Sequence, residues 1–413
     1  MSARHTVRAL ALITALALVA AACGDDDDDD ASSTTTTAAT EETTTTSAAP
    51  ELTGDPIVLM ALYEGSGAVA TPEVPEGAIG AAEAINAAGG IDGRPVEIIE
   101  CDLANDPNQA TACGQQAVDE GVVAVVGPVS ANAGQYFPAL EAAKIPVVGN
   151  TPASVQDFLS PASYPLYGGI ITASAGLADA LVMQGATTVS IARIDLAAAA
   201  AIGGFANAAL ERHGLVINND IPIPVGAPDM ATYVAAALEG GTDGVLVGLT
   251  GQDATNFIIA LRQANPDVLV SATTTEFAAV IEALGDAATG IIATDFFYDE
   301  QTNPEAYGAY VADMEAAGYD EFSGFRRNAY AAVKLVAEVV SGLTEITSAA
   351  LYDALPSVDG VDVGLLPPVQ FVTGGIGGIP RAFNPCGVYQ QLEGDEFVSI
   401  TDGFINVFTG EAC

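Results

Sequence analysis

Residues 121–130 read Gly-Val-Val-Ala-Val-Val-Gly-Pro-Val-Ser, and residues 145–154 read Ile-Pro-Val-Val-Gly-Asn-Thr-Pro-Ala-Ser. Each stretch holds a short apolar run that a glycine ends, Val122–Val126 and Ile145–Val148. Such runs are typical of strands buried on both faces of a parallel sheet. Ser130 is expected to cap a helix at Ala131–Ala143 between the two runs. The pair therefore predicts a strand–helix–strand unit.

Small hydroxyl residues follow both predicted strands. Ser130 comes after the first strand, and Thr151 and Ser154 come after the second. In an open α/β sheet, ligands bind beyond the carboxyl ends of the strands. Hydroxyl groups and spare N–H groups at that edge would suit a small polar or anionic group. The alternative is that these residues only cap helices and form turns.

The same alternation of strand and helix continues along the chain and indicates parallel sheets with helices on both faces. About 360 residues follow the N-terminal segment, which is more than one ordinary core and suggests two domains. The further strands expected are Ile57–Leu62, Val96–Glu100, Thr188–Ala192, Gly244–Val247, Val268–Ser271 and Gly290–Thr294. The further helices expected include Gly77–Ala88, Pro107–Glu120, Ala175–Gln184, Ala199–His213, Met230–Leu238, Gln252–Ala264, Pro304–Ala317 and Phe325–Ser341, before short strand-like pieces at the end.

The N-terminal segment has the pattern of an export signal. Residues 1–22 carry arginines near the start and then an apolar run that is too short for a membrane span. The sequence Ala20-Ala21-Ala22-Cys23-Gly24 resembles the lipobox of bacterial lipoproteins, which implies that Cys23 is lipidated and becomes the mature N-terminus. An ordinary cleavage site beside an incidental cysteine is the alternative. Residues 23–54, rich in Asp, Ser and Thr, are then expected to form a disordered tether to the membrane.

The charge of the chain excludes some partners. The formal net charge is −42 at pH 7. Binding to nucleic acid or to an anionic membrane surface requires a positive footprint, so neither is expected, and contact with a membrane would be through the lipid alone. The long-range field disfavours anionic ligands and tolerates zwitterions, neutral amides and cations.

Cysteine usage fits an exported protein. Apart from Cys23, the chain has four cysteines, and an even number in a secreted protein suggests disulfides. The pairing of sequence neighbours is Cys101 with Cys113 and Cys386 with Cys413. The sequence has no Cys-x-x-Cys spacing, and His213 is the one histidine beyond the signal, so no metal site is expected.

Catalysis finds little support in the sequence. A Ser-His-Asp arrangement would have to use His213, which lies beside Gly214 at an apparent helix end, a favourable place for a histidine without any chemistry. Neither a nucleophile elbow nor a nucleotide-binding motif is present, so we expect no enzyme and no cofactor.

The segment Ala84–Gly93, Ala-Ile-Asn-Ala-Ala-Gly-Gly-Ile-Asp-Gly, resembles the first helix and glycine turn of the type I periplasmic binding proteins. The resemblance is closest to the leucine/isoleucine/valine-binding branch and spans nearly all of 55–372. It is supported by the segments 102–110, 121–130, 145–154, 284–291 and 328–332.

This resemblance implies two Rossmann-like α/β lobes joined by a three-crossing hinge, closing on a ligand in the cleft between them. Lobe 1 would comprise 55–171 plus 296–366, and lobe 2 would comprise 172–295 plus 367–413. Carried over from the family, Ser130, Thr151 and Ser154 would hold a ligand carboxylate, and Tyr63 would supply an aromatic wall.

In the second lobe the sequence departs from the family pattern. Thr273 stands where amino-acid binders place an acid that meets the ligand ammonium, and Glu276 lies three positions later, as an alternative partner or as a helix start. Asp195 could replace that acid, or could be a turn residue. Thr250 belongs to a loop that has lost an aromatic residue of the family.

These observations together predict a monomeric, lipid-anchored receptor on the outer face of the bacterial cytoplasmic membrane. It would deliver a small polar ligand to an ABC permease, with a branched-chain or related aliphatic amino acid first and an amide or urea next. A sensor that signals to a membrane partner and a secreted hydrolase are the alternatives.

Overall fold

The computed structural model describes residues 52–66, 70–273, 278–320, 324–372, 375–394 and 396–413. The expectations for the signal segment, Cys23 and the tether lie outside these residues, apart from 52–54, and so does Glu276. The chain divides into two units, Met1–Ala48 and Ala49–Cys413, and the description below concerns the second.

The first third of the second unit supplies a five-stranded sheet in the order β2-β1-β3-β4-β5. All its neighbouring strands pair in parallel. The strands are β1 (Ile57–Tyr63), β2 (Val96–Asp102), β3 (Ala124–Val126), β4 (Val147–Val148) and β5 (Ser163–Tyr164).

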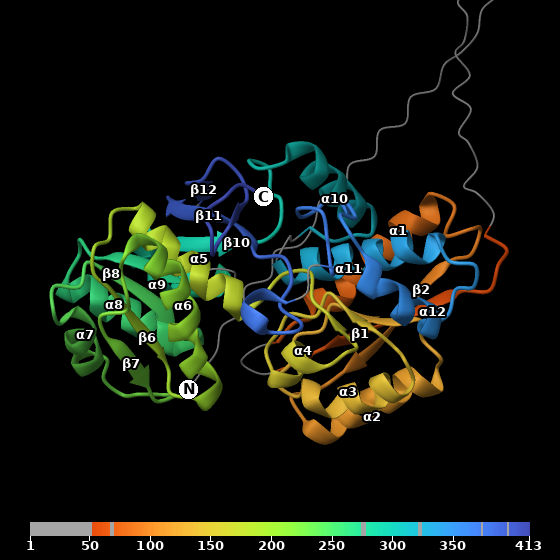
Figure 1. The fold of residues 1–413 in the computed structure, drawn as a ribbon, viewed down its shortest axis with the longest axis horizontal. Helices are drawn as coiled ribbons and strands as arrows, with labels where there is room; N and C mark the ends of the chain where they lie inside the picture. Colours follow the sequence, from red (N-terminus) through yellow and green to blue (C-terminus); the bar gives the residue numbers. More distant parts are fainter. Residues whose placement is uncertain (1–51, 67–69, 274–277, 321–323, 373–374, 395) are drawn as a thin grey trace, which may run out of the picture. The chain divides into compact units, whose positions relative to one another are not determined.

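Helices cover both faces of this sheet (Figure 1). They are α1 (Glu73–Ala87), α2 (Pro107–Asp119), α3 (Ala133–Ala142), α4 (Val155–Leu159), α10 (Pro304–Ala316), α11 (Gly324–Ser341) and α12 (Ser348–Ala354). Side chains alternate between the two faces of β1: Ile57, Leu59 and Ala61 belong to the core under α1 and α11, and Met60 and Leu62 belong to the core under α2 and α3. This period of two is what a fully covered parallel strand requires.

A second sheet has eight strands, with the order β12-β11-β10-β9-β8-β6-β7 and β13 paired to β11. The strands are β6 (Val189–Ile194), β7 (Asp220–Ile223), β8 (Gly244–Gly248), β9 (Leu269–Ala272), β10 (Ile292–Asp295), β11 (Cys386–Glu393), β12 (Glu396–Ser399) and β13 (Ile405–Asn406). From β6 to β10 the pairing is parallel, and β11 joins β10 and β12 antiparallel.

The second sheet also has a helical layer on each face. The cores place α5 (Ile170–Met183) and α6 (Ile202–Leu210) on one face, and α7 (Ala231–Leu238), α8 (Gly251–Ala264) and α9 (Ala278–Leu284) on the other. Residues of β8 again alternate between them, with Leu246 in the first core and Val245 and Val247 in the second.

The expected α/β class is confirmed, with a parallel first sheet and a mixed second sheet, both flanked by helices. Some expected boundaries were wrong. The strand expected at Val122–Val126 begins at Ala124, and the helix expected at Ala131 begins at Ala133, so Ser130 is not its N-cap. The predicted strands did not include β5 and β7, because Ser163–Tyr164 is very short and Asp220–Ile223 contains a proline.

Both expected disulfides are present. Cys101 at the end of β2 is bonded to Cys113 in α2, with their Cα atoms 5.8 Å apart. Cys386 at the start of β11 is bonded to Cys413, with a Cα–Cα distance of 6.2 Å. The second bond ties the last residues of the chain to the mixed sheet.

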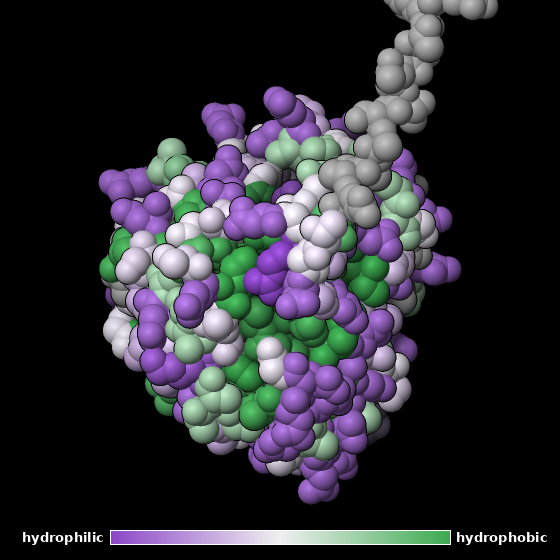
Figure 2. Space-filling view, turned by 90° about the vertical axis from the view of Figure 1, so that its right-hand side faces the viewer, coloured by the Kyte–Doolittle hydropathy of each residue, from purple (hydrophilic) through white to green (hydrophobic). Residues whose placement is uncertain are grey.

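Strand β2 lies at the edge of the five-stranded sheet. Its half-buried Ile98 and Ile99 are flanked by the exposed carboxylates Glu97 and Glu100. Charged residues on an edge strand oppose pairing with another chain. Figure 2 shows this side of the molecule, with apolar residues gathered near the middle and hydrophilic residues around them. Among the described residues, no helix combines the length and the apolar character needed to cross a membrane.

Candidate functional site

A cavity of about 270 Å³ lies where the carboxyl ends of strands from both sheets meet. Val129 and Thr151 come from the loops after β3 and β4 of the parallel sheet. Thr250 and Thr273 follow β8 and β9 of the mixed sheet, and Thr294 belongs to β10. We call this space the inter-sheet cavity. Its position is the one where open α/β sheets bind ligands.

Aromatic rings form one wall of the inter-sheet cavity. Tyr167 and Phe296 both line it and stack on each other, with ring centroids 4.6 Å apart and an interplanar angle of 16°. Phe297 meets the Tyr167 ring edge-on at 5.7 Å, and Phe325 adds a further ring to the lining. A flat apolar group would find a stacking surface here.

Thr151 is held in position from both sides. Its amide donates to the carbonyl of Pro128 at 2.8 Å, which joins the loops after β3 and β4. Its hydroxyl lies 3.2 Å from the hydroxyl of Tyr167 and accepts from the side-chain amide of Asn328 at 3.3 Å. Because the Asn328 amide donates to this oxygen, the Thr151 hydroxyl hydrogen remains for Tyr167 or for a ligand.

A glycine allows helix α11 to approach this loop. Gly149 has a φ of +70°, and a Cβ there would lie 2.5 Å from the Cβ of Ala332 in α11. Asn328, one turn earlier on α11, also donates a short hydrogen bond to the carbonyl of Gly149. The loop before Thr151 therefore packs directly against α11.

A buried carboxylate fixes the other end of the loop. Asp157 is 1% exposed, and it accepts from the amide of Ser154 at 2.8 Å, the amide of Ala153 at 3.2 Å and the side chain of Asn150 at 2.9 Å. Ser154 in return accepts from the amide of Asp157, which completes a capping box at the start of α4. Burial raises the pKa of Asp157 to about 6, although its hydrogen bonds favour the charged form.

This raised pKa gives a prediction for the pH dependence of stability. The folded-state pKa of Asp157, about 6, lies above its ordinary value of 3.8, so the folded chain holds this proton more tightly than the unfolded chain. The resulting stabilisation is complete below pH 3.8 and is lost as the pH rises through 6. We expect the free energy of unfolding to fall by about 2 kcal/mol between pH 4.5 and 7 because of this group.

The contribution of Asp157 can be isolated by comparing the native chain with Asp157→Asn in urea titrations at both pH values. Other carboxylates titrate in the same range, so the quantity of interest is the difference between the two chains. That difference should change by about 2 kcal/mol. A difference that stays constant would show that Asp157 titrates normally.

Helix starts supply further polar groups to the cavity. Thr250 precedes the first turn of α8, and its side chain makes no capping hydrogen bond. Gly169, which has no side chain to cap a helix, precedes α5. Gly169 and Ile170 both line the cavity. The N–H groups and the dipole at such helix starts favour an anionic or polar group.

The structure brings three of the predicted site residues together in the inter-sheet cavity: Thr151, Thr250 and Thr273. The other four that lie in the described part of the chain are outside its lining. The hydroxyl of Ser130 donates to the buried carboxylate of Glu64 at 2.6 Å and accepts from the amide of Asn132.

Of the remaining predicted residues, Ser154 caps α4, Tyr63 ends β1, and Asp195 is exposed after β6. Glu276 lies outside the described residues. The ligand-binding roles assigned to all eight residues stay predictions.

The part of the lining that the structure describes contains neither carboxylates nor basic side chains. Its polar groups are threonine hydroxyls, the Tyr167 hydroxyl and backbone groups. Such a site suits a ligand whose polar end is met by hydrogen-bond donors and whose body is apolar.

The sequence interpretation missed the aromatic wall. Tyr167 lies in the connection from β5 to α5, and Phe296 lies in the connection from β10 to α10. Both connections run between the two sheets, outside any strand or helix, so their rings belong to no periodic pattern. Position was the signal that could have found them. Phe296-Phe297-Tyr298 begins two positions after Thr294, the predicted strand end, and ligand contacts are expected beyond strand ends.

Several solved protein structures are similar to this fold. The chain resembles the solved structure of a possible leucine/isoleucine/valine-binding protein from Rhodopirellula baltica, with a TM-score of 0.71 and 18% identity over 86% of this chain and 98% of the other. It also resembles a branched-chain amino acid transporter substrate-binding protein from Streptococcus pneumoniae in complex with isoleucine (TM-score 0.69, 19% identity, 85% and 99% covered). A third is an ABC transporter solute-binding protein from R. palustris in complex with 4-hydroxybenzoate (TM-score 0.69, 17% identity, 85% and 97% covered).

At these sequence identities, the similarity to the solved structures shows the fold alone. None of the curated proteins compared with the chain matches it. A family model, described as periplasmic binding protein, matches residues 57–377, which is well over half of the sequence. The chain belongs to the periplasmic binding protein family.

Proposed function

We propose that this protein is an extracytoplasmic solute receptor, which captures a small ligand in the inter-sheet cavity and delivers it to the permease of an ABC importer. One observation carries the proposal: hydroxyl groups from the strand ends of two separate sheets line a single cavity. A ligand in such a site can contact both sheets at once. The chain belongs to a family of binding proteins, which supports binding without turnover. The threonine and aromatic side chains of the described lining also suit binding.

The transport cycle follows from this arrangement. We assign residues 55–171 and 296–366 to one lobe and 172–295 and 367–413 to the other. A ligand that contacts both lobes stabilises the closed form and so shifts the population toward it. The permease would recognise that form. A receptor of the same fold that signals to a membrane partner is the alternative, and transport by the reconstituted importer distinguishes the two.

A branched-chain or related aliphatic amino acid is the first candidate ligand. A cavity of about 270 Å³ suits a small molecule, and its apolar lining from Ile170, Leu177 and Val129 would receive an aliphatic side chain. Thr151 and the start of α5 would meet the carboxylate. The S. pneumoniae protein of the same fold was solved with isoleucine.

A small aromatic carboxylate is the second candidate. The Tyr167–Phe296 stack gives a ring a flat surface. The described lining also lacks an acid to pair with an ammonium group. A ligand without an ammonium leaves no cationic group in the cavity without an acidic partner, which would otherwise cost binding energy. Its carboxylate would be met by hydroxyl and N–H donors. The R. palustris protein of the same fold was solved with 4-hydroxybenzoate. Amides and urea, being uncharged, come next.

A thermal-shift screen with isoleucine, 4-hydroxybenzoate, acetamide and urea tests the proposal. A ligand that binds the folded state raises the melting temperature in a concentration-dependent way. Calorimetry with the best ligand should then show that Thr151→Ala weakens binding by about 1–3 kcal/mol, because a hydrogen bond to a charged group is lost.

Thr111→Ala is the matched control for that experiment, since the Thr111 hydroxyl is exposed and donates to the carbonyl of Pro107 within α2. It should bind as the native chain does. Unchanged affinity in Thr151→Ala would remove Thr151 from the site. Hydrolysis of a ligand during the titration would instead favour a secreted enzyme.

We further propose that the protein is exported, held by a lipid on Cys23 and active as a monomer. The lipobox-like sequence that ends at Cys23 supports the anchor. Cell fractionation should find the native chain in the membrane pellet and Cys23→Ser in the soluble fraction. Retention of the variant in the membrane pellet would contradict lipidation.

A further inference from the structure

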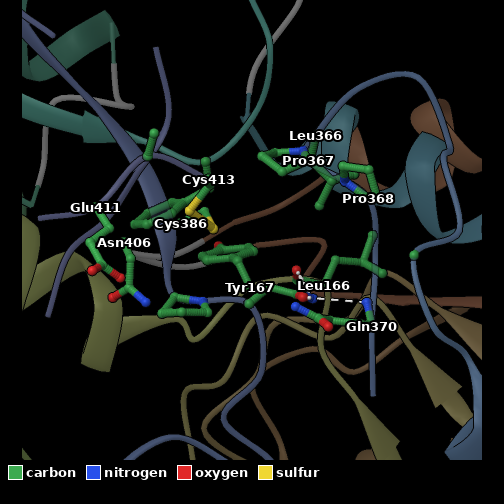
Figure 3. A pocket seen from close by; sticks show the side chains of 15 residues that line it. Leu166, Tyr167, Leu366, Pro367, Pro368, Gln370, Cys386, Asn406, Glu411 and Cys413 are labelled. Carbon is green, nitrogen blue, oxygen red and sulfur yellow. Dashed lines mark hydrogen bonds between the residues drawn. A yellow bond between two sulfur atoms is a disulfide. The ribbon is translucent and has the colours of Figure 1, made fainter. Parts of the chain in front are cut away.

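A second pocket, of about 330 Å³, lies against the aromatic wall of the inter-sheet cavity. Tyr167 and Phe296 line both spaces and are the two described residues common to both linings. Figure 3 shows Tyr167 in the middle of this pocket, below the Cys386–Cys413 disulfide. The aromatic stack therefore separates the second pocket from the inter-sheet cavity.

The second pocket has rigid apolar walls on part of its surface, and the amide side chains of Gln370, Asn384 and Asn406 belong to the rest of its lining. Pro367, Pro368 and Pro385 line it beside the two rings and the disulfide. Proline rings fix the backbone angle φ, and a disulfide links two segments covalently, so little conformational entropy is lost when a ligand enters. A compact ring would fit a space of this size and composition.

Glu411 has the only charged side chain in the described lining. The nearby Arg212 lies against Gly410, but it pairs with the buried Asp179 on the other side. None of the ion pairs observed among the described residues uses the Glu411 carboxylate. Figure 3 shows Glu411 and Asn406 together at one end of the pocket.

We propose that the second pocket binds a small organic cation, namely a protonated amine that carries a compact apolar or aromatic ring. The ammonium pairs with Glu411, and the ring packs against the prolines and the face of Tyr167. The net charge of −42 favours the approach of a positive ligand over a negative one. This site is separate from the one proposed for the transported solute.

Benzylamine is a suitable probe, with benzyl alcohol and benzoate as its uncharged and anionic counterparts. Calorimetry at neutral pH should show saturable 1:1 binding of benzylamine and weaker binding of benzyl alcohol. Benzoate should not bind the second pocket. Equal binding of benzylamine and benzyl alcohol, or no saturable binding of benzylamine, would overturn the proposal.

Three variants locate the binding. Glu411→Gln should weaken benzylamine binding by about two- to fivefold, as expected for loss of a solvent-exposed ion pair. Ala412→Trp should abolish it by filling the pocket. Glu97→Gln, which removes an exposed charge from the edge strand β2, should leave it unchanged.

Binding that survives Ala412→Trp would place benzylamine elsewhere and refute the site. Equal loss in Glu411→Gln and Glu97→Gln would reduce the effect to net charge and would also refute it. Neither result bears on the transported solute, which is measured separately through Thr151→Ala in the inter-sheet cavity. Circular dichroism of each variant confirms that it is folded before binding is measured.

Discussion

Asp179→Ala is expected to lower the free energy of unfolding by about 3–5 kcal/mol, the cost of removing one partner from a buried ion pair. Asp179 lies in α5 and is completely buried. Its carboxylate forms a short ion pair with Arg212 and lies 2.6 Å from Nε2 of His213. It also accepts from the hydroxyl of Tyr389 at 2.8 Å. The substitution leaves a guanidinium and a phenol without their acceptor.

The cost is large because Asp179 joins α5 to two other segments of the chain. Arg212 and His213 end the segment after α6, and Tyr389 lies in β11. Burial and the adjacent Asp179 carboxylate raise the pKa of Tyr389 well above its ordinary value, so the phenol keeps its proton at working pH. The Tyr389 phenol therefore remains a hydrogen-bond donor to Asp179 and ties β11 to α5.

Urea unfolding followed by far-UV circular dichroism measures this effect. Asp353→Ala is the control, since Asp353 pairs with Lys144 at the surface, where the two side chains are 65% and 51% exposed. That substitution should cost at most about 1 kcal/mol. If Asp179→Ala costs no more than the control, the buried network contributes nothing beyond a surface pair.

The second large effect is expected for Gly149→Ala, with a loss of about 2–5 kcal/mol in unfolding free energy from a left-handed backbone and from overpacking. A Cβ at this position would lie 2.5 Å from the Cβ of Ala332, so either the loop or α11 must move. Thr151 follows two residues later and depends on the same packing through Asn328. Ligand affinity should therefore fall together with stability.

Gly121→Ala separates strain from packing. Gly121 has a φ of +64°, and a Cβ there meets nothing within 4 Å. Only the cost of placing Ala in a left-handed conformation remains, which is about 1–2 kcal/mol. Denaturant titrations of both variants give the two costs. Similar losses for the two glycines would show that α11 adjusts freely, and would remove the packing argument for Thr151.

Much of the fold could be predicted from the sequence, because apolar runs bounded by turn residues mark buried parallel strands. At β8, for example, Gly244–Gly248 is buried along its whole length and directly follows the polar pair Thr242-Asp243. Short elements carry no such signal. Ser163–Tyr164 pairs with Val147–Val148, and only the tertiary structure brings these two segments together.

The candidate site was predictable in part for a related reason. Thr151, Thr250 and Thr273 all follow strands, so their position at one edge follows from the topology. Which of the strand-end residues line the cavity depends on individual hydrogen bonds, and these cannot be read from the sequence. Ser130 bonds Glu64, 66 positions away, and Ser154 bonds Asp157 three positions on, and neither lines the cavity.

The packing of α11 against α1 has a consequence for the order in which the protein folds. Arg326 in α11 pairs with Glu76 in α1, 250 positions earlier in the chain. The parallel sheet and α1 are synthesised first, yet α11, which completes the layer that α1 begins, emerges much later. The nascent sheet thus has an incompletely covered apolar face from the synthesis of β5 to that of α11, and completion of its core waits for the last quarter of the polypeptide.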